Sequence, residues 1–220
     1  MILNSPPVIK LVVFDLGDVI LKLNWEKPLS ALKMAHANDK ELFHRILTSH
    51  EGSYDLYERG KIQGQEFFTR FKAELAIDSP TETIETAWES LVDGPTKGIE
   101  GVLDQIPDKF PLYLLSNITE NLYQYLKLGS VVPRFPVLSR FKKTYASFLL
   151  QARKPELQIY RQVFEDLKKV HSQLLPSEIL FIDDRQDNVK GAQKAGFVAE
   201  TCRAADAKDI EAILKRHRVI

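Results

Sequence analysis

KLVVFD, residues 10–15, places apolar side chains, three of them β-branched or aromatic, on four consecutive positions before the chain turns polar at Asp15. A run of this kind is typical of a strand that is covered on both faces, as in a parallel sheet. Two later segments repeat the pattern, LYLLS at 112–116 and ILFID at 179–183. Stretches of helical periodicity lie between and after these runs. We therefore predict an α/β fold, a doubly wound, Rossmann-like parallel sheet with right-handed βαβ crossovers.

The stretch that follows the first run holds helical stripes and no convincing strand. One of its helices is predicted to begin at SPTE, residues 79–82, which reads as a capping box with proline at the first helical position. The segment DGPTKG, residues 93–98, breaks the helical pattern and is interpreted as a hinge. We predict two domains, an α/β core of residues 1–20 and 97–220 and an inserted α-helical cap domain of residues 21–96.

Composition excludes several classes of protein. Apolar residues make up 44% and charged residues 27% of the 220 positions, and the 30 basic and 30 acidic side chains cancel. This balance excludes a disordered chain and lacks the basic footprint of a nucleic-acid or anionic-membrane binder. The single cysteine, Cys202, excludes a disulfide framework. No apolar run approaches the roughly 20 residues that span a bilayer. We expect a cytoplasmic monomer or homodimer without nucleic-acid or membrane partners.

Polar residues stand where each apolar run ends: Asp15, then Ser116 and Asn117, then Asp183 and Asp184. Any one of them taken alone is more often a helix cap or turn former. In an open parallel sheet, however, the carboxyl ends of the strands meet at one edge, where ligands bind. Three carboxylates gathered there cannot all stay ionised without a cation, and oxygen ligands suit Mg²⁺. The pattern therefore predicts a magnesium site.

Lys154 is the candidate for a second positive charge, in the sequence Arg153-Lys154-Pro155. A lysine in such a place is more often a solvated surface residue. Beside a carboxylate and metal site, its ammonium group could hold a phosphate oxygen as a point charge.

These segments resemble, in order and spacing, the four motifs of the haloacid dehalogenase-like (HAD) hydrolase superfamily. They are FDLGDV at 14–19, LSN at 115–117, RKP at 153–155 and FIDDRQDN at 181–188. The first and fourth are specific, the other two are supportive, and the resemblance covers about residues 11–196. The inserted helical stretch is similar to the cap of helical-cap subfamily I. The FDLG start and the turn Glu58-Arg59-Gly60 look most like the sugar-phosphate (glucose-1-phosphate) phosphatase branch.

The resemblance implies a Mg²⁺-dependent phosphatase that acts on a small phosphorylated metabolite such as a sugar phosphate. Asp15 takes the place of the nucleophile that forms an aspartyl-phosphate. The same comparison implies that Asp15, the Gly17 carbonyl and Asp184 bind Mg²⁺. Asp183 and Asn188 are then expected to orient those ligands.

The resemblance also implies how the phosphate is bound. Ser116, the Asn117 backbone N–H and Lys154 are expected to hold its oxygens, and Lys154 thereby also counts as catalytic. In the cap, Tyr54, Tyr57 and Arg59 are our candidates to face the substrate.

The chain departs from the family pattern at one position. Many family phosphatases carry an aspartate two residues after the nucleophile as general acid and base, whereas this chain has Gly17 there and Asp18 one residue later. Asp18 can replace it only if the backbone turns its side chain inward, and we expect it to face away. General acid–base assistance typically contributes about 10²–10⁴-fold, so its loss predicts a slow but measurable enzyme.

Two alternatives stay open. The first is a metal-independent 2-haloacid dehalogenase, in which Asp15 attacks carbon; such enzymes also lack the second aspartate, but the pair Asp183-Asp184 favours a metal. The second is a weakly active or inactive scaffold that binds a phosphorylated ligand. This alternative stays open because Gly17 stands where many family phosphatases carry the general acid.

Overall fold

A five-stranded parallel sheet forms the centre of the computed structural model, which describes residues 8–34 and 37–220. Its strands, in spatial order, are β5 (Lys143–Ala146), β4 (Leu112–Ser116), β1 (Leu11–Phe14), β6 (Ile179–Asp183) and β7 (Val198–Thr201). Every neighbouring pair is parallel. The predicted parallel α/β sheet is therefore confirmed, and the three predicted strands are its three central ones, buried along their whole length.

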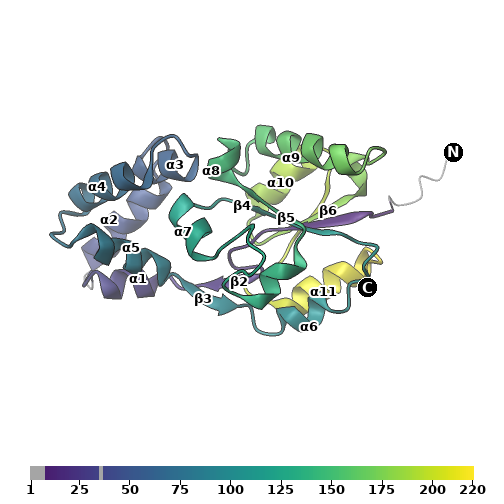
Figure 1. Ribbon diagram of the computed structural model, residues 1–220, viewed down its shortest axis with the longest axis horizontal. Coiled ribbons are helices and arrows are strands. Elements are labelled where there is room, and N and C mark those ends of the chain that lie inside the picture. The colour runs from purple at the N-terminus through teal and green to yellow at the C-terminus, as the bar shows by residue number, and fades with distance from the viewer. Residues whose placement is uncertain (1–7, 35–36) are drawn as a thin grey trace.

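Helices cover both faces of this sheet (Figure 1). Those of the core are α6 (Ile99–Leu103), α7 (Glu120–Tyr125), α8 (Ser147–Leu150), α9 (Leu157–Val170), α10 (Gln186–Lys194) and α11 (Ala207–Arg216), with 3₁₀ turns η1 (Pro136–Arg140) and η2 (Pro176–Glu178). Alternate residues of β1 separate the two layers: Leu11 and Val13 pack with α9 and α10, while Val12 and Phe14 pack with α6 and α11. Both faces are buried because strand side chains alternate between them.

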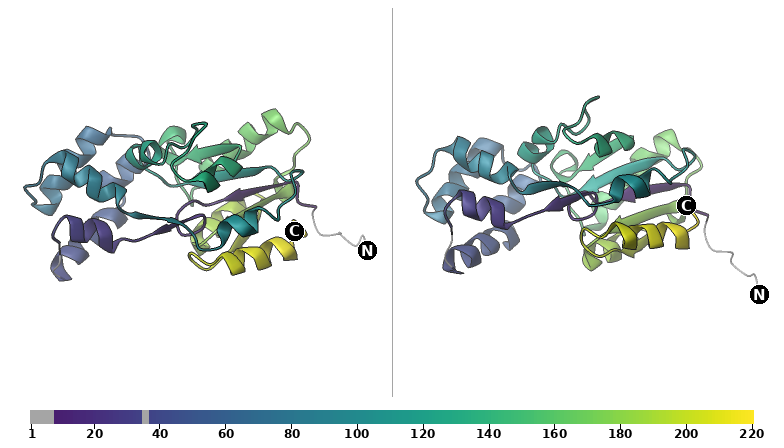
Figure 2. Two further views of the ribbon diagram at one scale, coloured as in Figure 1. Left: turned by 60° about the horizontal axis from the view of Figure 1, so that its bottom comes forward. Right: turned by 90° about the horizontal axis from the view of Figure 1, so that it is seen from below.

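A helical lobe stands at the end of the sheet where the strands finish (Figures 1 and 2). Its helices are α1 (Glu26–Ala31), α2 (Ala37–Thr48), α3 (Ser53–Glu58), α4 (Gly64–Leu75) and α5 (Thr81–Glu89). Its core is aromatic, with the rings of Phe67, Phe71 and Trp88 within 5.2–5.6 Å of one another, centroid to centroid. Burying such rings supplies much of the apolar area that a small lobe needs.

The predicted capping box at the start of α5 is wrong. The helix begins at Thr81, its N-terminal flanking residue is Pro80 with an extended ψ of 148°, and no side chain caps it. Because Pro80 itself is extended, Ser79 lies one residue too far from the first turn to accept its N–H groups.

Two short antiparallel strands join the lobe to the core, β2 (Leu21–Leu23) and β3 (Val92–Pro95). The interpretation of residues 93–98 as a hinge is therefore wrong for β3, whereas the described part of the stretch from about residue 25 to 92, expected to hold no convincing strand, is helical up to the start of β3 at Val92. The sequence VDGP hides the strand because glycine and proline are rare in strands. It forms here because the outgoing and returning chains run side by side.

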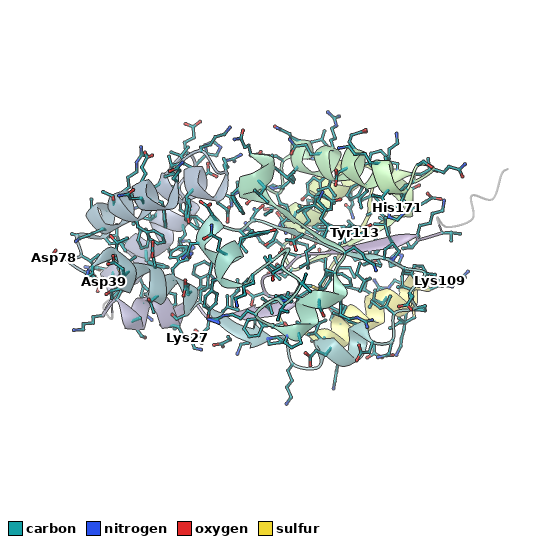
Figure 3. All side chains as sticks on the ribbon, viewed as in Figure 1. Lys27, Asp39, Asp78, Lys109, Tyr113 and His171 are labelled. Atoms are coloured by element: carbon teal, nitrogen blue, oxygen red, sulfur yellow. The ribbon has the colours of Figure 1, made fainter. Side chains whose placement is uncertain are left out.

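An ion pair anchors the lobe end of this ribbon. Lys27 of α1, labelled in Figure 3, lies 2.5 Å from the Asp93 carboxylate of β3. The predicted domain boundaries, after residues 20 and 96, both fall at the core end of the ribbon, where Leu21 pairs with Pro95. No helix in the described parts of the chain is long and apolar enough to cross a bilayer.

Candidate active site

The residues that end the central strands come together at the edge of the sheet that faces the lobe. Asp15 directly follows β1, whereas Ser116 and Asp183 are the last residues of β4 and β6. Carboxylate oxygens of Asp15, Asp183 and Asp184 all lie within 4.8 Å of one another. The opposite end of the sheet carries a different pair, Tyr113 and His171, hydrogen bonded at 2.9 Å (Figure 3). The sequence-based expectation that three distant acidic segments converge thus matches the geometry.

Asp183 is saturated by protein donors. Its carboxylate lies 2.7 Å from the Lys154 ammonium and accepts hydrogen bonds from the Asn188 side chain at 2.9 and 3.1 Å and from the Arg185 backbone N–H at 2.8 Å. Its side chain is fully buried. A carboxylate with this many donors is placed to hold Lys154 and Asn188 in position.

Lys154 is buried, with 1% of its side chain exposed. Its ammonium nitrogen lies 2.7 Å from Oδ1 of Asp15 and 2.7 Å from Oδ2 of Asp183, and it donates to the Leu115 carbonyl oxygen at 2.9 Å. Burial alone would lower the pKa of Lys154, but the two carboxylates raise it above its usual value. All three ammonium protons have acceptors, so the charge is fixed in place.

Asn117 positions the backbone of Lys154. Its side-chain amide donates to the Lys154 carbonyl oxygen at 3.0 Å and accepts from the Lys154 N–H at 2.9 Å. The second and third predicted motifs are therefore joined by a pair of hydrogen bonds. Ser116 is buried beside them, and its hydroxyl makes only a long 3.4 Å contact with the Asn117 carbonyl oxygen.

The acidic cluster carries more negative than positive charge. Burial raises the pKa of Asp15 to about 8; Lys154 opposes the rise, and Asp183 and Asp184 add to it. Burial, followed by the charge of Asp183, raises the pKa of Asp184 to about 6. Three carboxylates share one ammonium group, so a further cation would relieve their repulsion.

The donor atoms fit a hard divalent cation. Asp15 and Asp184 offer carboxylate oxygens, and among the described residues no backbone N–H donates to the Gly17 carbonyl oxygen. An all-oxygen set of this kind suits Mg²⁺, which keeps several water ligands.

Asp18 holds the turn that leads into β2. It has a positive φ of 53°, and its carboxylate accepts the Leu23 N–H at 3.0 Å. Its backbone N–H donates to the Leu21 carbonyl oxygen at 2.7 Å, and its own carbonyl accepts from the Ala205 N–H at 2.6 Å. This carboxylate is engaged in the turn, in line with the expectation that Asp18 does not replace the missing acid.

Packing around Gly17 explains why position 17, where many family phosphatases carry an aspartate, has no side chain. A Cβ built on Gly17 would lie 2.8 Å from Cδ1 of Leu23. The side chain of Leu23 therefore occupies the space into which an aspartate at this position would grow.

A cavity of about 400 Å³ extends from the acidic cluster to the lobe. Of the three lobe residues expected to face substrate, only Tyr54 lines it. Tyr57 is buried elsewhere, and its hydroxyl accepts the Asn121 N–H at 3.0 Å. Arg59 is also wrongly predicted: it pairs with Asp55 at 3.0 Å and with Glu156 at 2.5 Å and does not reach the cavity.

Arg153 and Glu58 are cavity residues that the sequence reasoning missed. The Arg153 guanidinium lies 2.6 Å from the Asp55 carboxylate and 2.8 Å from that of Glu58, and Tyr54 donates to Glu58 at 2.9 Å. Burial raises the pKa of Glu58, opposed by Arg153. Both residues belong to motifs that were singled out for their neighbours, Lys154 and Arg59. The motifs of the sequence therefore include both residues. That their side chains line the cavity depends on how the lobe packs against the core.

Close packing seals the lobe against the core beside this ion-pair cluster. Ser147 at the start of α8 is buried, and its hydroxyl donates to the Glu58 carbonyl oxygen at 2.6 Å. Gly60 has a positive φ of 64°, and a Cβ there would lie 2.3 Å from the Phe148 carbonyl oxygen. Only glycine allows the turn after α3 to come this close.

Comparison with known proteins agrees with the geometry. The family model of haloacid dehalogenase-like hydrolases matches residues 9–196. A D-ribitol-5-phosphate phosphatase from Bacteroides thetaiotaomicron is 26% identical over 200 residues, which cover 86% of this chain and 90% of that protein. A drimenol cyclase from Aspergillus calidoustus is also 26% identical, over 86% of this chain but only 33% of the cyclase.

Several solved structures are also similar to this chain over most of its length. A HAD family enzyme from Bacteroides thetaiotaomicron in complex with magnesium and inorganic phosphate superposes with a TM-score of 0.73 at 29% identity, covering 90% of this chain and 96% of that one. A predicted HAD-like family hydrolase from Porphyromonas gingivalis has a TM-score of 0.77 at 26% identity, covering 96% and 98%. The L-2-haloacid dehalogenase of Xanthobacter autotrophicus, 18% identical with a TM-score of 0.60 over 89% and 78%, shares the fold.

Proposed function

The chain belongs to the haloacid dehalogenase-like hydrolase family, and from this premise we propose that it is a Mg²⁺-dependent phosphatase of a small phosphorylated metabolite. One observation carries the proposal: the buried Lys154 ammonium lies 2.7 Å from both Asp15 and Asp183, with Asp184 in the same carboxylate cluster. This arrangement combines a nucleophile, a fixed positive charge and oxygen ligands for a divalent cation.

Asp15 is the nucleophile of the proposed reaction. Its Oδ1 is held by Lys154 and by the Leu16 N–H at 2.6 Å, which fixes the direction of the carboxylate. A carboxylate oxygen attacks phosphorus, the bond from phosphorus to the leaving oxygen breaks, and the leaving oxygen takes up a proton. Water then hydrolyses the aspartyl-phosphate and returns Asp15 to its free form.

Asp15, Asp184 and the Gly17 carbonyl are the proposed ligands of Mg²⁺. The bound ion supplies the positive charge that lets an anionic phosphate approach an anionic nucleophile. Asp183 and Asn188 act indirectly, because they hold Lys154 and each other in place. The magnesium-bound solved relative supports this assignment.

Ser116 and the Asn117 N–H are the proposed donors to the phosphate oxygens, and the Lys154 ammonium is the positive charge proposed to hold them. They lie at or beside the end of β4, next to Asp15. In phosphoryl transfer, charge spreads over the equatorial oxygens, and fixed donors placed there stabilise the transition state.

The helical lobe acts as a cap that excludes water and selects the leaving group. The cavity between lobe and sheet supports this role. The ribitol-phosphate phosphatase supports a small phosphorylated substrate, with sugar phosphates among the candidates.

The test is hydrolysis of p-nitrophenyl phosphate with Mg²⁺ by the native protein and by Asp15→Asn. The variant keeps the size of the side chain but removes the nucleophilic charge, so we expect kcat to fall by more than about 10³-fold. Asp187→Asn is the matched control, because Asp187 is 73% exposed on the same acidic segment and does not line the cavity. Equal rates for native protein and Asp15→Asn, a rate unaffected by EDTA, or halide release from 2-haloacids without Mg²⁺ would contradict the proposal.

A further inference from the structure

Beyond the phosphate-binding end, much of the wall of the cavity is apolar. Its side chains come from the ribbon, the lobe and the start of α7: Leu23, Trp25, Leu47, Val92, Ile118 and Leu122. These segments are far apart in the sequence, and they meet only because the lobe closes over the sheet edge. The same cavity is continuous with Asp15 and Lys154. Whatever alcohol the phosphate is attached to must therefore lie against this wall.

The apolar wall begins directly beside the nucleophile. Leu23 Cδ1 fills the space next to Gly17, 2.8 Å from where a Cβ would stand. A charged or hydroxyl-bearing side chain is thus absent from position 17, and a hydrocarbon group takes its place. The first atoms of the leaving group meet a hydrocarbon surface on this side.

The polar side chains at the lobe end of the cavity are largely paired with one another, although Oε2 of Glu58 has an ion-pair contact but no hydrogen bond. Glu58 accepts from Tyr54 and pairs with Arg153, which also pairs with Asp55. Asn117 uses both ends of its amide on the Lys154 backbone. Such groups have little hydrogen-bonding capacity left for the hydroxyls of a sugar or polyol.

Of the remaining polar residues that line the wall, His44, Thr48 and Arg185 are exposed to solvent, and Asp18 is partly buried with its carboxylate on the Leu23 N–H. The buried apolar side chains of Val92, Ile118 and Leu122 therefore form the enclosed surface that carries no charge. A buried hydroxyl without a partner lowers affinity by about tenfold or more, whereas each buried methylene raises it roughly fourfold. Both effects on affinity favour a substrate whose leaving group is apolar.

We propose that the substrate is a phosphomonoester whose leaving group is apolar, an aromatic or aliphatic alcohol, rather than a polyhydroxylated sugar. This inference rests on the proposed phosphatase function and specifies the substrate class of that site. The phosphate binds at the acidic cluster and Lys154, and the hydrocarbon part packs on Leu23, Leu47 and Ile118.

A series of 4-alkylphenyl phosphates tests the proposal on the native protein with Mg²⁺. Phenyl, 4-methylphenyl, 4-ethylphenyl and 4-propylphenyl phosphate have leaving groups of nearly equal basicity, so the chemistry stays constant while the apolar area grows. We expect kcat/KM to rise roughly threefold to fourfold per added carbon until the cavity is full. A matched pair isolates polarity: 4-ethylphenyl phosphate is expected to exceed 4-(hydroxymethyl)phenyl phosphate by about tenfold or more.

Two variants locate the effect on the wall. Leu47→Asn places an amide on the apolar surface and is expected to flatten the increase in kcat/KM across the series. Leu42→Asn is the control, because Leu42 is likewise half-buried on α2 but does not line the cavity. It is expected to keep the full increase. If Leu47→Asn fails to fold, the series on the native protein decides the question alone.

The outcomes distinguish a failure of the proposed substrate class from a failure of the proposed phosphatase function. Hydrolysis of the esters with a flat or falling series, or a higher kcat/KM for ribitol 5-phosphate and glucose 6-phosphate than for 4-ethylphenyl phosphate, overturns the apolar leaving group and leaves the phosphatase function standing. Absence of hydrolysis of every ester overturns the phosphatase function itself. A rising series that only Leu47→Asn flattens supports the proposal.

Discussion

The two ends of the cavity are built in opposite ways. At the sheet edge, Asp15, Lys154 and Asp183 are almost fully buried. The Lys154 ammonium nitrogen lies 2.7 Å from a carboxylate oxygen of each aspartate, at the ends of β1 and β6. At the lobe end, Arg153 and Glu58 meet across separate helices and loops, and apolar side chains complete the wall. The sheet thus positions the groups that we propose for chemistry, whereas the inserted lobe contributes much of the surface that we propose for substrate selection.

Replacing Lys154 would break the sheet-edge half most severely. Lys154→Met removes the ammonium group that lies 2.7 Å from the buried carboxylates of both Asp15 and Asp183. Stranding buried charges in this way costs about 3–5 kcal/mol of unfolding free energy. Phosphatase activity is expected to fall with it by more than about 10³-fold. Urea unfolding and p-nitrophenyl phosphate turnover measure the two effects. Lys169→Met, at a position 76% exposed, is expected to change unfolding free energy by less than about 0.5 kcal/mol.

Replacing Arg153 tests the lobe end against a matched arginine. Arg153 and Arg59 both pair with Asp55, but only Arg153 lines the cavity. We expect Arg153→Met to lower kcat/KM by about 10- to 100-fold, because it also leaves the buried Glu58 carboxylate, which lines the cavity, without its ion-pair partner. Arg59→Met should destabilise the seal between lobe and core and change kcat/KM by less than threefold when the protein is folded. Equal losses of kcat/KM in the two variants would show that both act only through docking of the lobe.

A substitution at Gly60 probes how tightly the lobe seals on the core. Gly60→Ala would place a methyl group 2.3 Å from the Phe148 carbonyl oxygen at a positive φ. The expected loss of unfolding free energy is about 1–3 kcal/mol, the usual range for local backbone strain. Gly101→Ala in α6 is the control, because a Cβ there meets nothing within 4 Å and alanine favours the helix by up to about 1 kcal/mol. Thermal unfolding of both variants decides the comparison; an unchanged Tm for Gly60→Ala would contradict close packing at this turn.

The pH dependence of stability should distinguish the acidic cluster from the lobe interface. Burial raises the pKa of Asp15 to about 8 and that of Asp184 to about 6. The folded protein then binds more protons than the unfolded chain between pH 4 and 8, so its stability without metal falls as pH rises through this window. We expect added Mg²⁺ to raise Tm by a few degrees more at pH 8 than at pH 5. An equal rise at both values would contradict a shared carboxylate site.

Asp55 at the lobe interface carries the opposite sign. The Arg153 and Arg59 guanidinium groups overcome the effect of burial and hold the pKa of Asp55 below its usual value. Its contribution to stability is therefore present above the ordinary aspartate pKa near 4 and is lost as pH falls below it. Asp55→Asn should reduce the loss of Tm in that acidic range only.

The sheet edge was predictable because its signals are local. The runs at 11–14, 112–116 and 179–183 are buried on both faces, so their hydrophobicity is continuous and their polar ends are easy to find. The edge strands β5 and β7 were missed because they are partly exposed and carry charged residues. Convergence of Asp15, Asp183 and Asp184 then follows from parallel strand order alone.

The lobe end was not predictable because it depends on orientation. Nothing in the sequence distinguishes Leu47, which lines the cavity, from Leu42 five residues earlier on the same helix. Arg59 looked like the more promising arginine, yet Arg153 reaches the cavity while Arg59 crosses to Glu156. Such differences are decided by side-chain contacts between segments distant in sequence, which a periodicity argument does not resolve.

The ribbon has a consequence for how such a protein can be varied. Leu21 pairs with Pro95, so the chain leaves the core and returns to it at a single point. Sequences inserted between two such neighbouring ends can differ in length and fold without stretching the host backbone. The lobe can therefore be exchanged as a unit: recombination at this junction would replace the helical lobe and leave the carboxylates of Asp15, Asp183 and Asp184 in register.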